Sequence, residues 1–184
     1  MAVNISAQIT PNPHTLKFVV DRMLLEYGSI DFSNREKAAT SPLVLKLYAI
    51  NGVTAILVGT NFVSVTKSNM IDWTDLAEPV ISTLQKELDG DSIGVDVSLL
   101  TAASTASGGT DIESRIRQIL DNEIRPAVAM DGGDITFHSY EDGVVMLQLQ
   151  GACSSCPSST LTLKMGIENR LREEIPEIRD VVQI

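Results

Sequence analysis

Two cysteines are the residues of this chain best suited to chemistry. The 184-residue sequence contains only Cys153 and Cys156, three positions apart in the run GACSSCPSSTLTL. This run follows an apolar segment typical of a strand and precedes a segment with helical spacing, so we expect both thiols near the N-terminal end of a helix. The helix dipole and the unpaired N–H groups there favour anionic sulfur, which either binds metal or attacks disulfides.

The number of cysteines limits the site that they can form. A thiolate site for zinc or for an iron-sulfur cluster needs about four ligands, and one chain supplies two. The remaining ligands must come from a second copy, another protein or a small thiol. Two such loops facing each other across a two-fold axis would complete a cluster at an interface between subunits.

Three other interpretations of the cysteine pair compete with a shared cluster. In a thioredoxin-like oxidoreductase the first thiolate attacks a disulfide and the second resolves it, but only 28 residues follow Cys156 (184 − 156) and no aromatic residue precedes Cys153. Zinc bridging a dimer would use the same ligands. In the third interpretation, both cysteines are ordinary small residues at the start of a helix. Spacing and context favour metal binding over redox catalysis.

The remaining polar residues give weaker signals. His14 and His138 each lack a second histidine at ligand spacing, so we expect surface or hydrogen-bonded roles and no metal ligation. The segment Asp131-Gly132-Gly133-Asp134 is expected to stop a helix. No serine has a histidine partner that the sequence can place nearby, so nucleophilic catalysis has no support and we expect a protein that is not an enzyme. Hydroxyl and backbone donors next to the thiols could support coordinated sulfur; they belong to Ser154, Ser155, Ser158 and Ser159.

The bulk composition argues against several classes of partner. A formal charge of −10 and a pI of about 4.6 disfavour nucleic acid as a main ligand, because phosphate binding depends on clustered Lys and Arg. No apolar stretch approaches the roughly 18 residues of a membrane span. The start MAVNISAQIT has neither a basic leader nor an apolar signal core. We therefore expect a soluble cytoplasmic protein with no nucleic-acid or membrane partner.

The order of sequence patterns predicts an α/β (α+β) fold of two small domains, each a short sheet packed with helices. A Gly-, Ser-, Ala- and Thr-rich tract predicts a flexible linker over 91–110, between a domain at 1–90 and one at 111–184. The first domain should hold strands, a helix, a hairpin and a second helix. The expected segments are strands at NISAQIT, HTLKFVV and Leu24 to Ile30, a helix from Pro42 to Ile50, a hairpin of VTAILVG and FVSVTK, and a helix from Asp72 that Pro79 kinks or delays.

The second domain should follow the order helix, two strands, helix, with the cysteine loop between strand and helix. The run TDIE at Thr110 forms a capping-box pattern that begins the first helix. The expected segments are a helix to Asp131, strands DITFHSY and VVMLQLQ, a helix from Pro157 to Pro176, and a short last strand at VVQI.

These motifs resemble a known family. The segment from about Ile112 to Ile178, with IRPAVAMDGGDI followed by GACSSCPSSTLTLKMGIENRLREEIPEI, resembles the C-terminal domain of the NifU-like (Nfu) iron-sulfur scaffold proteins. The segment from about Ile9 to Leu88, with TPNPHTLKF, FSNREKAATSPL and INGV, resembles the N-terminal domain found in many of them. Together these segments cover most of the chain.

The resemblance implies a function for the cysteine pair. Cys153 and Cys156 would bind a cluster, usually 4Fe-4S with 2Fe-2S also possible, bridged between two subunits of a homodimer. The cluster would come from upstream assembly proteins and pass to apo iron-sulfur proteins. No cysteine precedes Cys153, which implies that the extra scaffold domain of the nitrogen-fixation relatives is absent. Mitochondrial relatives carry a transit peptide that we do not see, so the resemblance favours a bacterial cytosolic protein or a chain that has been trimmed.

Overall fold

Alternating apolar and polar residues build a five-stranded sheet in the N-terminal region, with strand order β1-β2-β5-β4-β3. All of its strand pairs are antiparallel. The computed structural model describes residues 3–90, 93–100, 110–154 and 157–184, with the backbone alone at 157–162. The elements of this region are β1 (Ile5–Ile9), β2 (Thr15–Val20), β3 (Ile30–Phe32), the 3₁₀ turn η1 (Glu36–Ala38), α1 (Pro42–Tyr48), β4 (Val53–Val58), β5 (Phe62–Lys67) and α2 (Trp73–Leu88).

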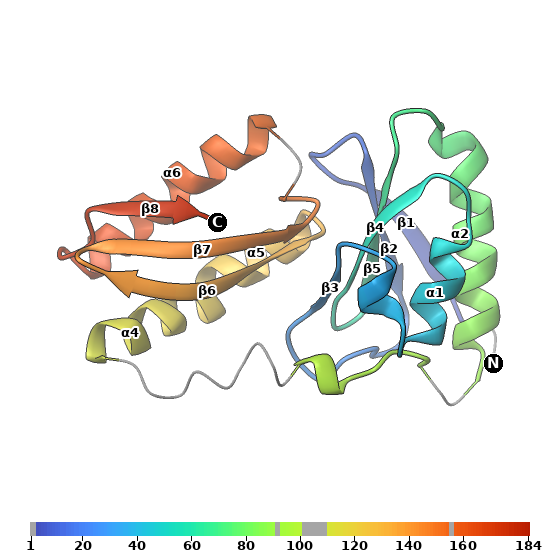
Figure 1. Ribbon diagram of the computed structural model, residues 1–184, viewed down its shortest axis with the longest axis horizontal. Coiled ribbons are helices and arrows are strands. Elements are labelled where there is room, and N and C mark those ends of the chain that lie inside the picture. The colour runs from blue at the N-terminus through green and yellow to red at the C-terminus, as the bar shows by residue number, and fades with distance from the viewer. Residues whose placement is uncertain (1–2, 91–92, 101–109, 155–156) are drawn as a thin grey trace.

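The two faces of this sheet differ in what covers them. On one face, apolar side chains such as Phe18, Ile56 and Val65 pack with those of α1 and α2 in one buried cluster, and Figure 1 shows both helices on the side away from the C-terminal region. Because side chains alternate along a strand, their neighbours point to the opposite face. We call this opposite side the second face; its residues are Lys17, Asp31, Leu57, Phe62 and Ser64.

The C-terminal region has a smaller sheet, in the order β6-β7-β8, with its own buried apolar cluster. The hairpin of β6 and β7 is antiparallel, and β8 lies parallel to β7. Apolar residues of the helices, including Ile116, Val128 and Leu171, pack on Leu147 of β7. The elements are α4 (Asp111–Ile119), the π-helical turn η2 (Leu120–Ile124), α5 (Arg125–Met130), β6 (Gly133–Glu141), β7 (Val144–Gly151), α6 (Pro157–Glu174) and β8 (Asp180–Gln183).

The predicted α/β fold class is confirmed, and so are most of the elements. The capping box forms as expected: Thr110 Oγ1 accepts from the Glu113 amide while the Glu113 carboxylate accepts from the Thr110 amide. The residues assigned to the linker at 101–109 lie outside the described residues. The domain limits 1–90, 91–110 and 111–184 therefore stay a prediction.

One expected element is wrong, and two others differ in detail. The strand predicted from Leu24 to Ile30 begins only at Ile30, because Leu24 is buried in a bend and Gly28 takes a positive φ of 68° that ends any extended run. Of the two effects expected of Pro79, a late start of α2 is excluded because the helix starts at Trp73, and a kink stays a prediction. The helix predicted from Thr110 to Asp131 forms, with a π-helical turn at 120–124 between α4 and α5.

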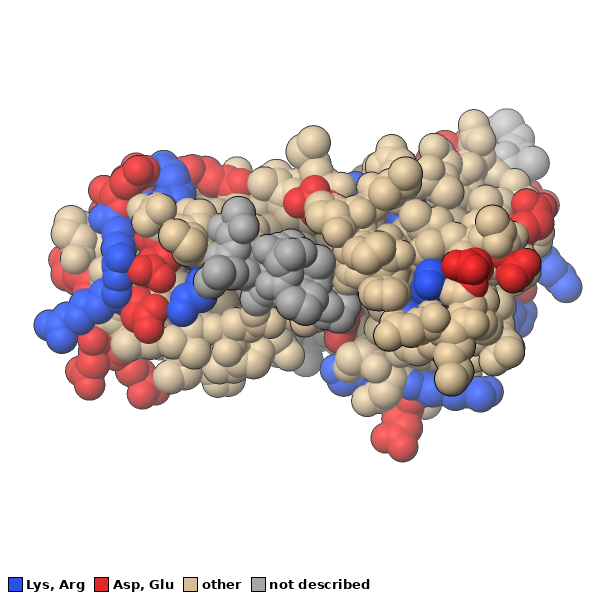
Figure 2. All heavy atoms as spheres, turned by 90° about the horizontal axis from the view of Figure 1, so that it is seen from above, with Lys and Arg blue, Asp and Glu red and all other residues tan. Residues whose placement is uncertain are grey.

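Charged side chains of both signs lie on the face of the molecule seen in Figure 2, with basic ones interspersed among acidic ones. Along the described part of the chain, no helix combines the length and the apolar character needed to cross a membrane.

Candidate functional site

Cys153 lies in a tight turn where β7 ends and before α6 begins. Gly151 closes β7 with a φ of +62°, and its carbonyl accepts from the Ser154 amide at 3.2 Å and from Ser154 Oγ at 2.9 Å. Cys153 is 5% exposed. Cys156 lies outside the described residues. The predicted position of a thiol before the N-terminus of a helix therefore holds for Cys153.

The expected support from serine hydroxyls is not seen at the one serine that can be assessed. Ser154 donates its hydroxyl hydrogen to the Gly151 carbonyl, so this donor serves the turn and not the thiol. Ser155 lies outside the described residues, as do the side chains of Ser158 and Ser159.

Gly133, the first residue of β6, forms the floor beneath Cys153, and Gly132 precedes it in the turn after α5. An alanine Cβ at Gly133 would lie 2.5 Å from Cys153 Sγ and 2.9 Å from the Gln150 carbonyl oxygen, closer than real carbon contacts allow. Gly132 has a φ of +76° and donates to the Ala129 carbonyl, so it ends α5 as the sequence predicted. The glycine pair thus both stops a helix and lets the sulfur approach the backbone.

A buried carboxylate fixes the start of β6. Asp134 accepts from Arg125 Nε at 3.0 Å and Nη2 at 2.9 Å, and also from the Ile135 amide at 2.7 Å. Ser29, from the N-terminal region, donates to the same carboxylate. The hydrogen bonds from Arg125 to Asp134 raise the pKa of the Arg125 guanidinium above its ordinary value. This bidentate pair holds α5 against the strand that leads away from the Gly132-Gly133 turn.

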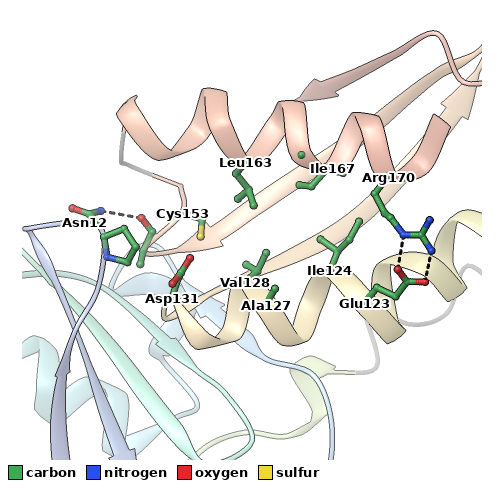
Figure 3. Close-up of a pocket in the computed structure, with 13 residues that line it drawn as sticks. Asn12, Glu123, Ile124, Ala127, Val128, Asp131, Cys153, Leu163, Ile167 and Arg170 are labelled. Carbon is green, nitrogen blue, oxygen red and sulfur yellow. Dashed lines mark hydrogen bonds and ion pairs between the residues drawn. The ribbon is translucent and has the colours of Figure 1, made fainter. Parts of the chain in front are cut away.

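A turn of the N-terminal region reaches the cysteine loop. Asn12 Nδ2 donates to the Ala152 carbonyl at 3.0 Å, next to Cys153 (Figure 3). The turn is ordered by its own side chains, because Asn12 Oδ1 accepts from the His14 amide at 3.0 Å and Thr10 Oγ1 accepts from the Asn12 amide at 3.2 Å. The sequence predicted a turn here but gave no sign that it contacts the site.

An apolar cleft of about 670 Å³ runs from Cys153 between α6 and the helix formed by η2 and α5. Figure 3 shows Leu163 and Ile167 on one wall and Val128 on the other. The ion pair of Arg170 and Glu123 closes the far end of the cleft: Arg170 Nε and Nη2 lie 2.6 and 3.0 Å from the two carboxylate oxygens of Glu123. The other residues of the walls include Ile124 and Ala127.

The histidines are not brought together. His138 is exposed at an irregularity of β6, which agrees with the expected surface role. His14 lies in the Asn12 turn with Nδ1 buried and, among the described residues, without a hydrogen-bond partner, so the expected hydrogen-bonded role fails for that atom. Within the described ranges no three His, Cys, Asp or Glu side chains gather as a metal site.

Comparison with known proteins shows which family has this arrangement. The model of the NifU-like domain matches residues 116–182, and that of the scaffold protein Nfu/NifU N terminal matches residues 5–91. The human "NFU1 iron-sulfur cluster scaffold homolog, mitochondrial" is 39% identical over 184 residues, covering 98% of this chain and 71% of that protein. The chain belongs to the NifU-like (Nfu) iron-sulfur cluster scaffold family.

Further Nfu relatives match to a similar extent. "NifU-like protein 4, mitochondrial" from Arabidopsis thaliana is 41% identical over 185 residues, covering 97% of this chain and 65% of that protein, so the chain spans about two thirds of such relatives. The solution NMR structure of a NifU-like protein from Saccharomyces cerevisiae is 24% identical with a TM-score of 0.46, covering 50% of this chain and 84% of that chain.

The expected bacterial cytoplasmic location is wrong. Nfu relatives from human, Arabidopsis and Drosophila that match nearly the whole chain are named as mitochondrial. The expectation relied on the start of the sequence, MAVNISAQIT. Targeting segments are cleaved from mature proteins, so that stretch carries no information on location.

Gly133→Ala tests the packing beneath Cys153. We expect the added methyl group to push against Cys153 Sγ and the Gln150 carbonyl, lowering the free energy of unfolding by about 2 kcal/mol and changing the alkylation rate of Cys153. Urea unfolding and mass-spectrometric alkylation of metal-free protein measure both. Gly90→Ala is the matched control, because its Cβ would meet nothing within 4 Å. Equal stability of the two variants would contradict the role given to Gly133.

Asp134→Asn tests the buried carboxylate. The amide can no longer accept both charged hydrogen bonds from Arg125, so we expect a loss of about 2 kcal/mol in the free energy of unfolding by urea. Asp142→Asn is the control, since Asp142 is exposed in the β6–β7 turn with a φ of +48°, which asparagine tolerates. A variant at 134 as stable as the control would show that the pair contributes nothing.

Proposed function

We propose that this chain holds a 4Fe-4S cluster, with 2Fe-2S as a second form, between two subunits through Cys153 and Cys156 and transfers it to apo-proteins. One observation carries the proposal: the chain's only two cysteines are three positions apart in the sequence, and Cys153 lies between β7 and α6 at the head of an apolar cleft. The cluster is cargo in this role, and the protein needs no catalytic group of its own.

The ligand count supports a shared cluster. Four thiolates complete the coordination of a cubane cluster, and two chains related by a two-fold axis supply them as two identical pairs. Each pair comes from one short loop, so the loops can meet face to face without rearranging either sheet. The loaded species is therefore a homodimer.

The surroundings of Cys153 suit a thiolate that must later be released. The sulfur rests against the Gly133 backbone and opens to a cleft with mostly apolar walls. Cys153 is 5% exposed, and the low-dielectric wall of the cleft limits access by water to its sulfur. Transfer then proceeds by ligand exchange, in which thiolates of the recipient replace Cys153 and Cys156 one after another.

The names of the relatives supply the cellular setting. The human and Drosophila relatives are named as mitochondrial iron-sulfur cluster scaffold homologs, so we propose that this chain works in an organelle, where it takes clusters from upstream assembly proteins. The thioredoxin-like alternative is not favoured by this family membership.

Replacing the cysteines tests this function. We expect Cys153→Ala and Cys156→Ala each to abolish cluster binding, because removal of one thiolate per chain leaves the dimer two ligands short. Anaerobic reconstitution followed by Mössbauer spectroscopy and mass measurement in solution should show a 4Fe-4S dimer for the native chain and cluster-free protein for both variants. Ser154→Ala is the control, since its hydroxyl serves the turn.

Two results would count against the proposal. One is a loaded protein that is strictly monomeric with no external thiol present. The other is catalytic reduction of insulin disulfides by metal-free protein, which would support the thiol-redox alternative instead.

A further inference from the structure

The second face of the N-terminal sheet contacts the turn beneath Cys153. Lys17 Nζ donates to the Ala129 carbonyl at 2.8 Å, near the end of α5. An added Cβ at Gly132 would lie 2.8 Å from Ser64 Oγ and 3.4 Å from Lys17 Cβ. Lys17 and Ser64 are directly paired across β2 and β5, so two neighbouring side chains of the sheet pack on this turn.

The row of paired residues that contains Lys17 and Ser64 continues across the sheet to Leu57 and Asp31, which contact the cysteine loop. An added Cβ at Gly151 would lie 2.7 Å from Leu57 Cδ2, and the Gly151 amide donates to the Asp31 carboxylate. Leu57 pairs with Asp31 across β4 and β3. Burial raises the pKa of the Asp31 carboxyl above its ordinary value, although the charge of Lys37 and the Gly151 amide partly offset this. A single cross-strand row therefore contacts both turns around the thiol.

This contact has the character of a reversible interface. The two buried apolar clusters share no residue, and neither includes Leu57 or Phe62. Open cavities of about 550 and 430 Å³ lie along the junction of the two regions. Ser64 Oγ is buried and has no hydrogen-bond partner among the described residues, a cost that water would remove on opening. Polar, imperfectly packed contacts of this kind permit domain movement.

The contact also occupies space that a shared cluster requires. Pro11 and Asn12 close the Cys153 end of the cleft, and Asn12 bonds to the Ala152 carbonyl (Figure 3). A bridging cluster must bring the partner's thiolates within one cluster width of Cys153. This chain's own Asn12 turn takes up part of the space around Cys153.

We propose that the second face and the Asn12 turn form a docking surface for the cysteine loop of the same chain, which covers Cys153 in the cluster-free protein and is released when a cluster joins two chains. The release step rests on the proposed function. The docking itself does not, so the two can be tested separately.

The docking is tested on full-length, metal-free protein. In the closed form Cys153 should react slowly with iodoacetamide, and Lys17 should react more slowly with acetic anhydride than the exposed Lys86. Asn12→Ala removes the interdomain hydrogen bond to Ala152 and the bond from the His14 amide that orders the Asn12 turn, so Cys153 alkylation should rise about fivefold. Leu57→Lys puts a longer, charged side chain where Leu57 packs against Gly151, so Cys153 alkylation should rise by more than about tenfold.

Matched controls separate opening from general instability. Asn69→Ala and Thr54→Lys change exposed positions of the same region, on the turn after β5 and on β4, and should leave both reactivities unchanged. Leu57 lies outside the apolar cluster of its own region, so Leu57→Lys should keep the native circular dichroism. Small-angle X-ray scattering should show a larger radius of gyration for the two interface variants than for the controls.

The possible results distinguish docking from cluster binding. Unchanged Cys153 and Lys17 reactivity in both interface variants would overturn the docking surface. For the release step, cluster-loaded native protein should lose the protection of Lys17, and continued protection would overturn release. Faster alkylation in the variants together with a failure of any form to bind a cluster would instead refute the proposed function and leave the docking intact.

Discussion

The close contact between the Cys153 sulfur and the Gly133 backbone is the constraint on which the rest of the site depends. No side chain fits between them, so the turn between α5 and β6 must follow one path. Arg125 and Asp134 hold that path by joining the helix to the strand. The pairing of Gly133 with Gly151 then fixes where β7 ends and where the cysteine loop begins. The hydrogen bonds of Ser154 to the Gly151 carbonyl then close the turn that places Cys153 at the cleft.

Local patterns predicted most of the elements because they arise from short-range physics. The capping box at Thr110 and the turns that join the hairpins involve residues a few positions apart, so their signals are complete within one window of sequence. The same reasoning gave one role for the Gly132-Gly133 pair, that of a helix stop. Its second role, close approach to sulfur, depends on residue 153 and has no signature near residue 133.

Long-range contacts account for what sequence reasoning missed. Asn12 and Ala152 are 140 positions apart, and nothing in TPNPH distinguishes an asparagine that only shapes a turn from one that also bonds to a distant loop. The long-range contact of Ser29 was equally hidden in the sequence. Ser29 lies within a segment predicted to be a strand, yet its hydroxyl donates to Asp134 of the other region. Leu57 fits the alternating pattern that predicted β4. That pattern could not show whether the face of the sheet that carries Leu57 is exposed to water or packed against the rest of the chain. Each of these residues belongs to the contact between the two regions.

A docked N-terminal region would reconcile two opposing requirements on the thiols. Exposed thiolates at a helix start are readily oxidised, so a carrier between loads benefits from cover. The same cover weakens the apparent affinity for a cluster, because only the chains in the open form can bind one. The apparent affinity is the affinity of the open form multiplied by the fraction of chains that are open. A contact built from a few hydrogen bonds, one buried leucine and unfilled cavities is weak enough for cluster binding to overcome. A fully apolar interface of the same extent would protect the thiols better but would hold the chain closed against its own cargo.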